Sequence, residues 1–197
     1  MPKCKIGVLI SGGGTNLQSI IDATNQGRLD AKVELVVSNK KNAYGLQRAE
    51  KHGISNCYIG KMNYPDFDNR SDALLKALSD NEIDLIVMAG YLEIVSPKLI
   101  EAYGDKIINI HPSLIPNYCG KGFYGMHVHE AVKNNNEKFS GATVHFVDEG
   151  VDTGQMIIQE AVRLCPEDSP EDIQKKVLKV EHRILIEAIN KYVNGEI

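Results

Sequence analysis

The strongest constraint on the fold is the alternation of apolar strand patterns with amphipathic helix patterns in the first half of the chain. The segment at 84–89 is almost entirely apolar, which is typical of a strand covered on both faces. Alternation of this kind predicts right-handed crossovers and a parallel sheet with helices on both sides. The strand patterns lie at 5–10, 33–37, 57–59 and 84–89, and the helix patterns begin near residues 17, 46, 66 and 97.

The second half of the chain departs from this alternation. A β-branched strand at 107–111 is followed by two longer strand patterns, at 140–147 and 155–163, and by a long final helix. The short connection at 148–154 favours antiparallel pairing of the two long strands. We therefore expect one domain over 1–197, with a Rossmann-like, mostly parallel α/β sheet to which the C-terminal part adds antiparallel strands.

Composition and charge exclude several classes of function. The net charge is −4 and no basic stripe lies along any predicted helix, so nucleic-acid binding is not expected. No apolar run is long enough to span a membrane, and no signal-peptide pattern is present. The four cysteines are widely scattered and lack metal-ligand spacing, which disfavours a structural zinc site and suits a reducing cytoplasm.

Asn109 and His111 mark the first candidate site. Pro112 cannot continue a central strand, so the 107–111 strand should end at His111. Because strand side chains alternate between faces, Asn109 and His111 point the same way at the carboxyl end of a strand, where open α/β sheets bind ligands. An amide and an imidazole there can hydrogen-bond an oxyanion and carry a proton. The alternative is a histidine whose nitrogens simply bond backbone or water.

A glycine-rich loop forms the second candidate site. Gly12, Gly13 and Gly14 lie between the first strand and the first helix, where backbone N–H groups and the helix dipole favour an anion. The loop lacks the Gly-Lys-Ser/Thr of a Walker A motif, and Leu17 replaces the third glycine of a dinucleotide fingerprint. A single phosphate therefore fits better than a pyrophosphate. The alternative is a tight strand-to-helix turn that needs a glycine at positive φ.

The remaining polar clusters are weaker signals. Asp148 and Asp152 lie in an acidic connection, and a carboxylate facing His111 would favour the imidazolium and raise the histidine pKa. The His-x-His at 127–129 resembles half of a metal site, but no third ligand is near in sequence, so no metal is expected. His145 lies inside a predicted strand and is assigned to the core.

These residues closely resemble the folate-dependent formyltransferases, and within them the glycinamide ribonucleotide branch. The resemblance covers nearly the whole chain and depends on segments at 10–17, 88–91, 109–114, 141–145 and 148–154. The Asn-x-His-Pro-Ser-Leu segment is typical of the wider family, and the Ser-Gly-Gly-Gly-Thr-Asn segment is typical of that branch. Methionyl-tRNA formyltransferase and formyltetrahydrofolate deformylase carry a further domain, for which we expect no room in 197 residues.

The resemblance implies transfer of the formyl group of 10-formyltetrahydrofolate to the amine of N1-(5-phospho-D-ribosyl)glycinamide, in purine (IMP) biosynthesis. The part at 1–105 would bind the phosphate, and 106–197 would supply the catalytic and folate-binding loops. Both substrates are small molecules, no metal is implied, and a cytoplasmic monomer or homodimer is expected. The implied catalytic residues are Asn109, His111 and Asp152; the ribonucleotide-binding residues are Gly14, Thr15, Asn16 and Glu181; the folate-binding residues are Arg70, Leu92, Glu93, Ile94, Val95, Asn109 and Asp148.

Other functions are compatible with parts of the pattern. Another 10-formyltetrahydrofolate-dependent formyltransferase shares the Asn-x-His segment. An NADP-dependent reductase would use Lys40 or Lys41 for the 2′-phosphate, although the missing third glycine argues against it. A non-catalytic nucleotide-binding module would need only the glycine-rich loop. Glu93 departs from the resemblance, because many relatives carry a basic residue there, and we expect its charge to repel the glutamate tail of the folate.

Overall fold

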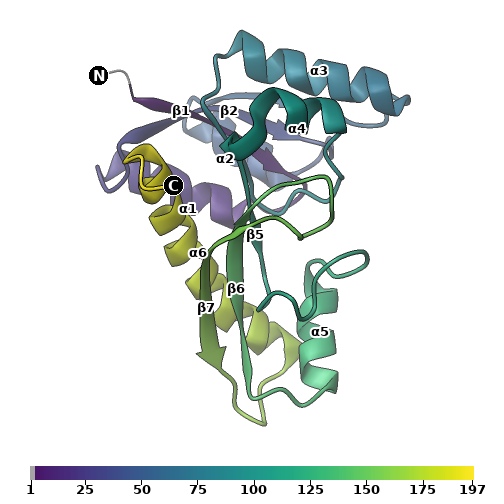
Figure 1. The fold of residues 1–197 in the computed structure, drawn as a ribbon, viewed down its shortest axis with the longest axis vertical. Coiled ribbons are helices and arrows are strands. Elements are labelled where there is room, and N and C mark those ends of the chain that lie inside the picture. The colour runs from purple at the N-terminus through teal and green to yellow at the C-terminus, as the bar shows by residue number, and fades with distance from the viewer. Residues whose placement is uncertain (1–2) are drawn as a thin grey trace.

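One sheet runs through the molecule from end to end (Figure 1). The computed structural model describes residues 3–197, and its seven strands follow the order β3-β2-β1-β4-β5-β6-β7. The pairs from β3 to β5 are parallel, whereas β5–β6 and β6–β7 are antiparallel, so the predicted fold is confirmed. The strands are β1 (Cys4–Ile10), β2 (Ala31–Ser38), β3 (Ser55–Tyr58), β4 (Leu85–Met88), β5 (Ile107–His111), β6 (Phe139–Phe146) and β7 (Met156–Arg163).

Helices cover both faces of the sheet. Leu17 and Ile20 of the first helix pack with Ile184 and Leu185 of the last helix in one buried cluster. Leu74, Leu78 and Leu99 form a second buried cluster on the opposite face. The long C-terminal helix crosses behind β6 and β7 and reaches the N-terminal half (Figure 1). The helices are α1 (Thr15–Asn25), α2 (Tyr44–Lys51), α3 (Phe67–Asp80), α4 (Pro97–Tyr103), α5 (Met126–Asn134) and α6 (Pro170–Val193).

Local signals set most element boundaries where they were predicted. The hydroxyl of Ser169 caps α6 by accepting from the N–H of Asp172, with Pro170 in the first turn. β5 ends at His111, directly before Pro112. Two strands begin two residues earlier than predicted, β2 at Ala31 rather than at 33 and β3 at Ser55 rather than at 57. In β3 the first two residues, Ser55 and Asn56, are polar and exposed, so they add no apolar pattern to detect.

The topology places three loops at one edge of the sheet. β1 lies between β2 and β4, so the strand order reverses there: β2 and β3 extend the sheet to one side of β1, and β4 and β5 extend it to the other. Open α/β sheets bind ligands at the carboxyl ends of the strands at such a reversal. The loop after β1 is the glycine-rich one, the loop after β4 contains Leu92, and the loop after β5 begins at Pro112. Across residues 3–197, no helix is long and apolar enough to cross a membrane.

A buried ion pair ties the loop after β4 to α3. Arg70 and Glu93 lie 2.6 Å apart, and their side chains are only 7% and 16% exposed. The guanidinium also donates to the carbonyl oxygens of residues 64, 65 and 66. The expectation that Glu93 carries a free negative charge toward a folate tail is therefore wrong, because Arg70 neutralises that charge within the fold.

Replacing Glu93 by lysine should destabilise the protein rather than improve folate binding. Two buried cations would face each other, and removing one partner of a buried pair costs about 3–5 kcal/mol of unfolding free energy. Glu93→Gln should cost less, because its amide oxygen can still accept from Arg70. Urea denaturation measures both variants. Asp72→Lys is the matched control, because it disrupts the exposed pair with Lys98 and should cost at most about 1 kcal/mol. A Glu93→Lys variant as stable as the parent would contradict the assigned role.

Candidate active site

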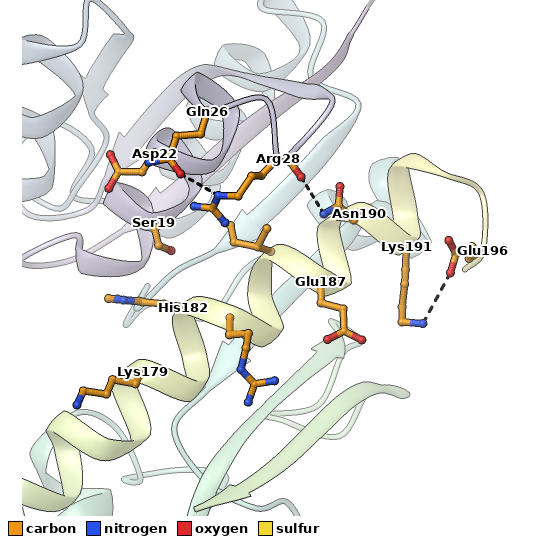
Figure 2. Close-up of a pocket in the computed structure, with 12 residues that line it drawn as sticks. Ser19, Asp22, Gln26, Arg28, Lys179, His182, Glu187, Asn190, Lys191 and Glu196 are labelled. Atoms are coloured by element: carbon orange, nitrogen blue, oxygen red, sulfur yellow. Dashed lines mark hydrogen bonds and ion pairs between the residues drawn. The ribbon is translucent and has the colours of Figure 1, made fainter.

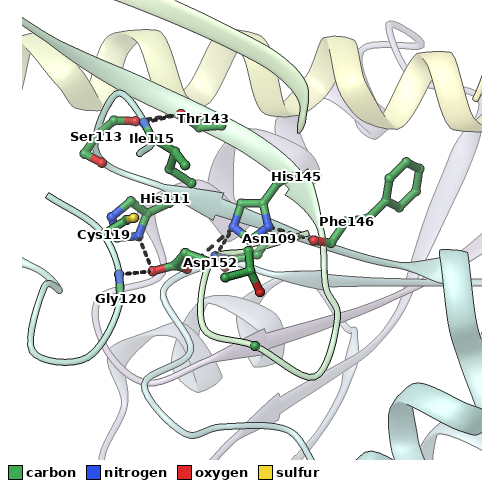
Figure 3. Close-up of polar contacts among 12 residues, drawn as sticks. Asn109, His111, Ser113, Ile115, Cys119, Gly120, Thr143, His145, Phe146 and Asp152 are labelled. Carbon is green, nitrogen blue, oxygen red and sulfur yellow. Dashed lines mark hydrogen bonds and ion pairs between the residues drawn. The ribbon is translucent and has the colours of Figure 1, made fainter. Parts of the chain in front are cut away.

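Asn109, His111 and Asp152 meet at the carboxyl end of β5 (Figure 3). Asn109 and His111 lie on the same face of the strand, as alternation requires, and Asp152 reaches them from the connection between β6 and β7. The Nδ2 of Asn109 lies 3.4 Å from Oδ1 of Asp152, and the Nδ1 of His111 lies 3.5 Å from its Oδ2. One carboxylate thus contacts both predicted side chains.

The loop after β5 closes over this group. The Nε2–H of His111 donates to the carbonyl oxygen of Tyr118 at 2.9 Å, and the N–H of Gly120 donates to Oδ2 of Asp152 at 2.9 Å. Asp152 itself adopts a left-handed backbone conformation, with φ +59°. Non-glycine residues rarely occupy that region, and such strain gathers at functional sites. The loop therefore positions the imidazole and the carboxylate together.

The pKa of His111 lies below its usual value, although its partner Asp152 acts to raise it. Burial disfavours the imidazolium and lowers the pKa, whereas Asp152 and the Tyr118 carbonyl favour the imidazolium and oppose that shift. The carboxylate of Asp152 raises the pKa of His111, as predicted, but burial lowers it by more, so the net direction is downward. Burial weighs more because the side chain of His111 is only 6% exposed.

Asp152 is held as a carboxylate. Burial alone raises the pKa of Asp152. The contacts with His145, His111 and the Gly120 N–H lower it by more, so the net pKa lies below its usual value. An ionised Asp152 accepts hydrogen bonds only. The N–H groups of Gly120 and Asn109 are its donors in the structure.

His145 is a member of this group that the sequence pattern missed. It lies on β6 directly opposite Asn109, and its Nε2 is 3.1 Å from Nδ2 of Asn109 and 3.5 Å from Oδ1 of Asp152. The residue is buried, as predicted, but it contacts the catalytic candidates rather than apolar core atoms alone. Antiparallel pairing was predicted for β6 and β7, but the register of β6 on β5 was not, and only that register places His145 beside Asn109.

The glycine-rich loop lies at the N-terminus of α1. Gly14 has φ +69°, and a Cβ there would lie 2.8 Å from the Cα of Gly45, so this glycine is required by the fold. At Gly12 and Gly13 a Cβ would meet no protein atom within 4 Å. Those two positions leave open space beside backbone N–H groups, which is the arrangement of an anion site.

Two further side chains support the loop. Arg48 of α2 donates from Nε to the carbonyl oxygen of Gly13 at 2.8 Å and places a cation beside the loop, a contact that the sequence did not indicate. Asn16 donates from Nδ2 to Glu181 of α6 at 2.7 Å. Glu181 is buried, which raises its pKa, and the Oδ1 of Asn16 is buried with no partner among the described residues. Asn16 and Glu181, two of the four residues predicted to bind the ribonucleotide, are therefore in contact.

The remaining predicted folate residues occupy the loops around β5. Leu92 and Ile94 are exposed, at 54% and 65%, whereas Val95 is buried in the core. The N–H of Leu92 donates to Ser11 Oγ, which joins this loop to the end of β1. Asp148 accepts from the N–H of Gly150 and the hydroxyl of Thr153, and so shapes the β6–β7 connection from within. Within residues 3–197, no group of three or more His, Cys, Asp or Glu side chains is arranged to hold a metal ion.

A separate groove of about 720 Å³ lies between α1 and α6, away from these residues (Figure 2). Its charges are of both signs. Lys191 pairs with Glu196 at 3.7 Å, and the Nε of Arg28 donates to Gln26. Because Arg28 and Lys191 already have partners, we do not assign the groove as a second candidate site.

Comparison with known proteins agrees with the geometry. Residues 4–189 match the Formyl transferase family model. The chain is 42% identical over 193 residues to a phosphoribosylglycinamide formyltransferase from Haemophilus influenzae, covering 98% of this chain and 89% of that protein. It is 38% identical to a chloroplastic enzyme of that name from Arabidopsis thaliana, covering 94% of this chain but 64% of the relative.

Solved structures give the same result. The glycinamide ribonucleotide transformylase 1 from Symbiobacterium toebii superposes with a TM-score of 0.92 at 38% identity, covering 98% of this chain and 89% of that one. The phosphoribosylglycinamide formyltransferase from Bacillus halodurans has a TM-score of 0.90 at 35% identity, covering 98% and 97%. With the family model spanning nearly all of the described residues, this chain belongs to the formyl transferase family.

Proposed function

We propose that this protein transfers the formyl group of 10-formyltetrahydrofolate to the amine of N1-(5-phospho-D-ribosyl)glycinamide, giving the N-formyl ribonucleotide and tetrahydrofolate in purine (IMP) biosynthesis. The observation that carries the proposal is the convergence of Asn109, His111 and Asp152 at the carboxyl end of β5. The similarity to proteins that are named for this reaction supports the choice of substrates. We expect the enzyme to act in the cytoplasm, as a monomer or homodimer.

In the proposed reaction the substrate amine attacks the formyl carbon, and the formyl oxygen becomes an oxyanion. N–H groups of Asn109 and His111 stabilise that charge, because donors fixed in a buried site act strongly on developing charge. The formyl oxygen takes the place of the Tyr118 carbonyl as acceptor from His111. The amine loses a proton, the folate nitrogen gains one as its bond to the formyl carbon breaks, and His111 carries the proton between them while Asp152 stabilises the imidazolium.

The two substrates bind on opposite sides of this group in our proposal. The backbone at Gly14 and Thr15, with Asn16, binds the ribonucleotide phosphate, and Glu181 meets its ribose or amine. The exposed apolar side chains of Leu92 and Ile94 offer a surface for the flat pterin ring. Backbone groups around Val95, Asn109 and Asp148 complete the folate site, while Arg70 and Glu93 hold its loop in place through their ion pair. No metal takes part.

Formyl transfer measured with purified protein tests the proposal directly. Spectroscopic detection of tetrahydrofolate release should require both substrates. His111→Ala and Asn109→Ala should each lower kcat by about 10²–10⁴-fold, the range for a positioned acid–base group or oxyanion donor. Both variants should stay folded, because these residues end a strand. A titration with NADPH in parallel tests the reductase alternative, and NADPH binding without formyl transfer would replace our proposal.

The pH dependence tests the role of Asp152. The carboxylate raises the pKa of His111 against the effect of burial, so Asp152→Asn should lower that pKa further. Activity that needs protonated His111 is present below this pKa and is lost as pH rises through it. The variant should therefore lose activity at a lower pH than the parent in a pH–rate profile. Asp148→Asn is the control, because the Asp148 carboxylate accepts from Gly150 and Thr153 of its own loop. An unchanged profile for Asp152→Asn would exclude the coupling.

Two glycine variants separate phosphate binding from folding. Gly13→Ala fits the fold but places a methyl group where an anion approaches, so the KM for the ribonucleotide should rise about tenfold or more, as expected when a hydrogen bond to a charged group is weakened. The KM for the folate should not change. Gly14→Ala should instead lower the melting temperature, because of its positive φ and the close Gly45 backbone. A Gly13→Ala variant with an unchanged ribonucleotide KM would place the phosphate elsewhere.

A further inference from the structure

We propose that His145 is a positioning residue that fixes the orientation of the Asn109 side-chain amide. The inference rests on the proposed function, in which Asn109 donates to the formyl oxygen. An asparagine amide carries donors on one side and an acceptor on the other, and only the donor side can stabilise an oxyanion. A neighbouring group must therefore fix the orientation of the Asn109 side-chain amide.

The imidazole of His145 is held in one tautomer. Its Nδ1 lies 2.7 Å from the carbonyl oxygen of Phe146, which can only accept, so Nδ1 carries the hydrogen. In the neutral ring Nε2 then has a lone pair and accepts. Its contact with Oδ1 of Asp152, at 3.5 Å, is longer than its contact with the Asn109 amide and is not a hydrogen bond. Nε2 faces Nδ2 of Asn109 at 3.1 Å, so the amide N–H donates to His145 (Figure 3).

The second N–H of Asn109 points toward Oδ1 of Asp152 at 3.4 Å. Both neighbours of the amide nitrogen are acceptors, so turning the amide over would set its oxygen against two acceptors in a buried site. The bond to His145 is the shorter one and locks the amide, whereas the longer contact to Asp152 leaves the second N–H available to the formyl oxygen. His145 thus acts through Asn109 without contacting the reacting atoms.

The strand geometry is suited to this role. Asn109 and His145 are direct partners across the antiparallel β5–β6 pair, where opposed side chains lie closest. The β6–β7 register shifts between Val144 and His145, and such irregularities re-aim a side chain next to a functional site. His145 is only 2% exposed, so water does not compete for Nε2.

Two substitutions at His145 separate positioning from packing. His145→Gln retains an acceptor near the position of Nε2 and should keep kcat within about threefold of the parent. His145→Phe fills the same space without an acceptor and should lower kcat by about 10- to 100-fold, since small misplacements of a catalytic group have effects of this size. The KM for both substrates should change little. Equal losses in both variants would overturn the proposal.

A double-mutant cycle with Asn109→Ala supplies the control. If His145 acts through Asn109, adding His145→Phe to Asn109→Ala should cause no further loss of kcat. If the two substitutions together lower kcat by the product of their separate factors, His145 acts independently of Asn109. That result would overturn the inference and leave the proposed function intact. An Asn109→Ala variant with unchanged kcat would instead contradict the role of Asn109 itself, and the inference with it.

A measurement on the unmodified protein avoids any effect of substitution on folding. At a pH where the ring is neutral, the ¹⁵N chemical shifts of His145 distinguish the two tautomers. A protonated Nδ1 and an unprotonated Nε2 are expected from the Phe146 and Asn109 contacts. The opposite tautomer would make Nε2 a donor, reverse the amide of Asn109 and overturn the proposal.

Discussion

The rest of the structure depends on β5 having a parallel neighbour on one side and an antiparallel neighbour on the other. The parallel side, through β4, joins β5 to the half of the sheet that carries the glycine-rich loop. The antiparallel side brings the chain back along β6, which places His145 opposite Asn109. The 148–154 connection then begins beside the start of β5, and Asp152 reaches from it to Asn109 and His111. A sheet that was parallel throughout would return its strands through helices and would leave Asn109 and His111 without partners.

The protonation states of His111 and Asp152 at this junction depend on two opposing effects, desolvation by burial and the attraction between opposite charges. Burial favours the neutral forms of both His111 and Asp152, and their mutual contact favours the charged forms. Burial prevails at His111 and the contacts prevail at Asp152, so the carboxylate stays ionised while the imidazole gives up a proton readily. A group of this kind suits proton transfer, because the buried imidazole releases a proton readily and the ionised carboxylate stabilises the imidazolium when it forms.

Much of the fold, and part of the candidate site, follows from local sequence. Alternating strand and helix patterns set the parallel half of the sheet, Pro112 ends β5, and Ser169 caps the last helix. Side-chain alternation on one strand was enough to place Asn109 beside His111. The features that sequence missed depend on pairs distant in the chain. His145 needs the β5–β6 register, Arg70 meets Glu93 from another element, and the pKa of His111 depends on how deeply the finished fold buries it.

The contact between Asn16 and Glu181 spans 165 positions of the sequence. A chain that emerges from the ribosome exposes the glycine-rich loop long before the helix that supports it exists, and contacts of such separation are slow to form because a long loop must close first. The loop and its partner helix therefore complete each other only after α6 has been synthesised. Partial chains would present β1 and α1 with their polar pocket open on one side, so the timing of translation, as well as the final packing, determines when the anion site comes into being.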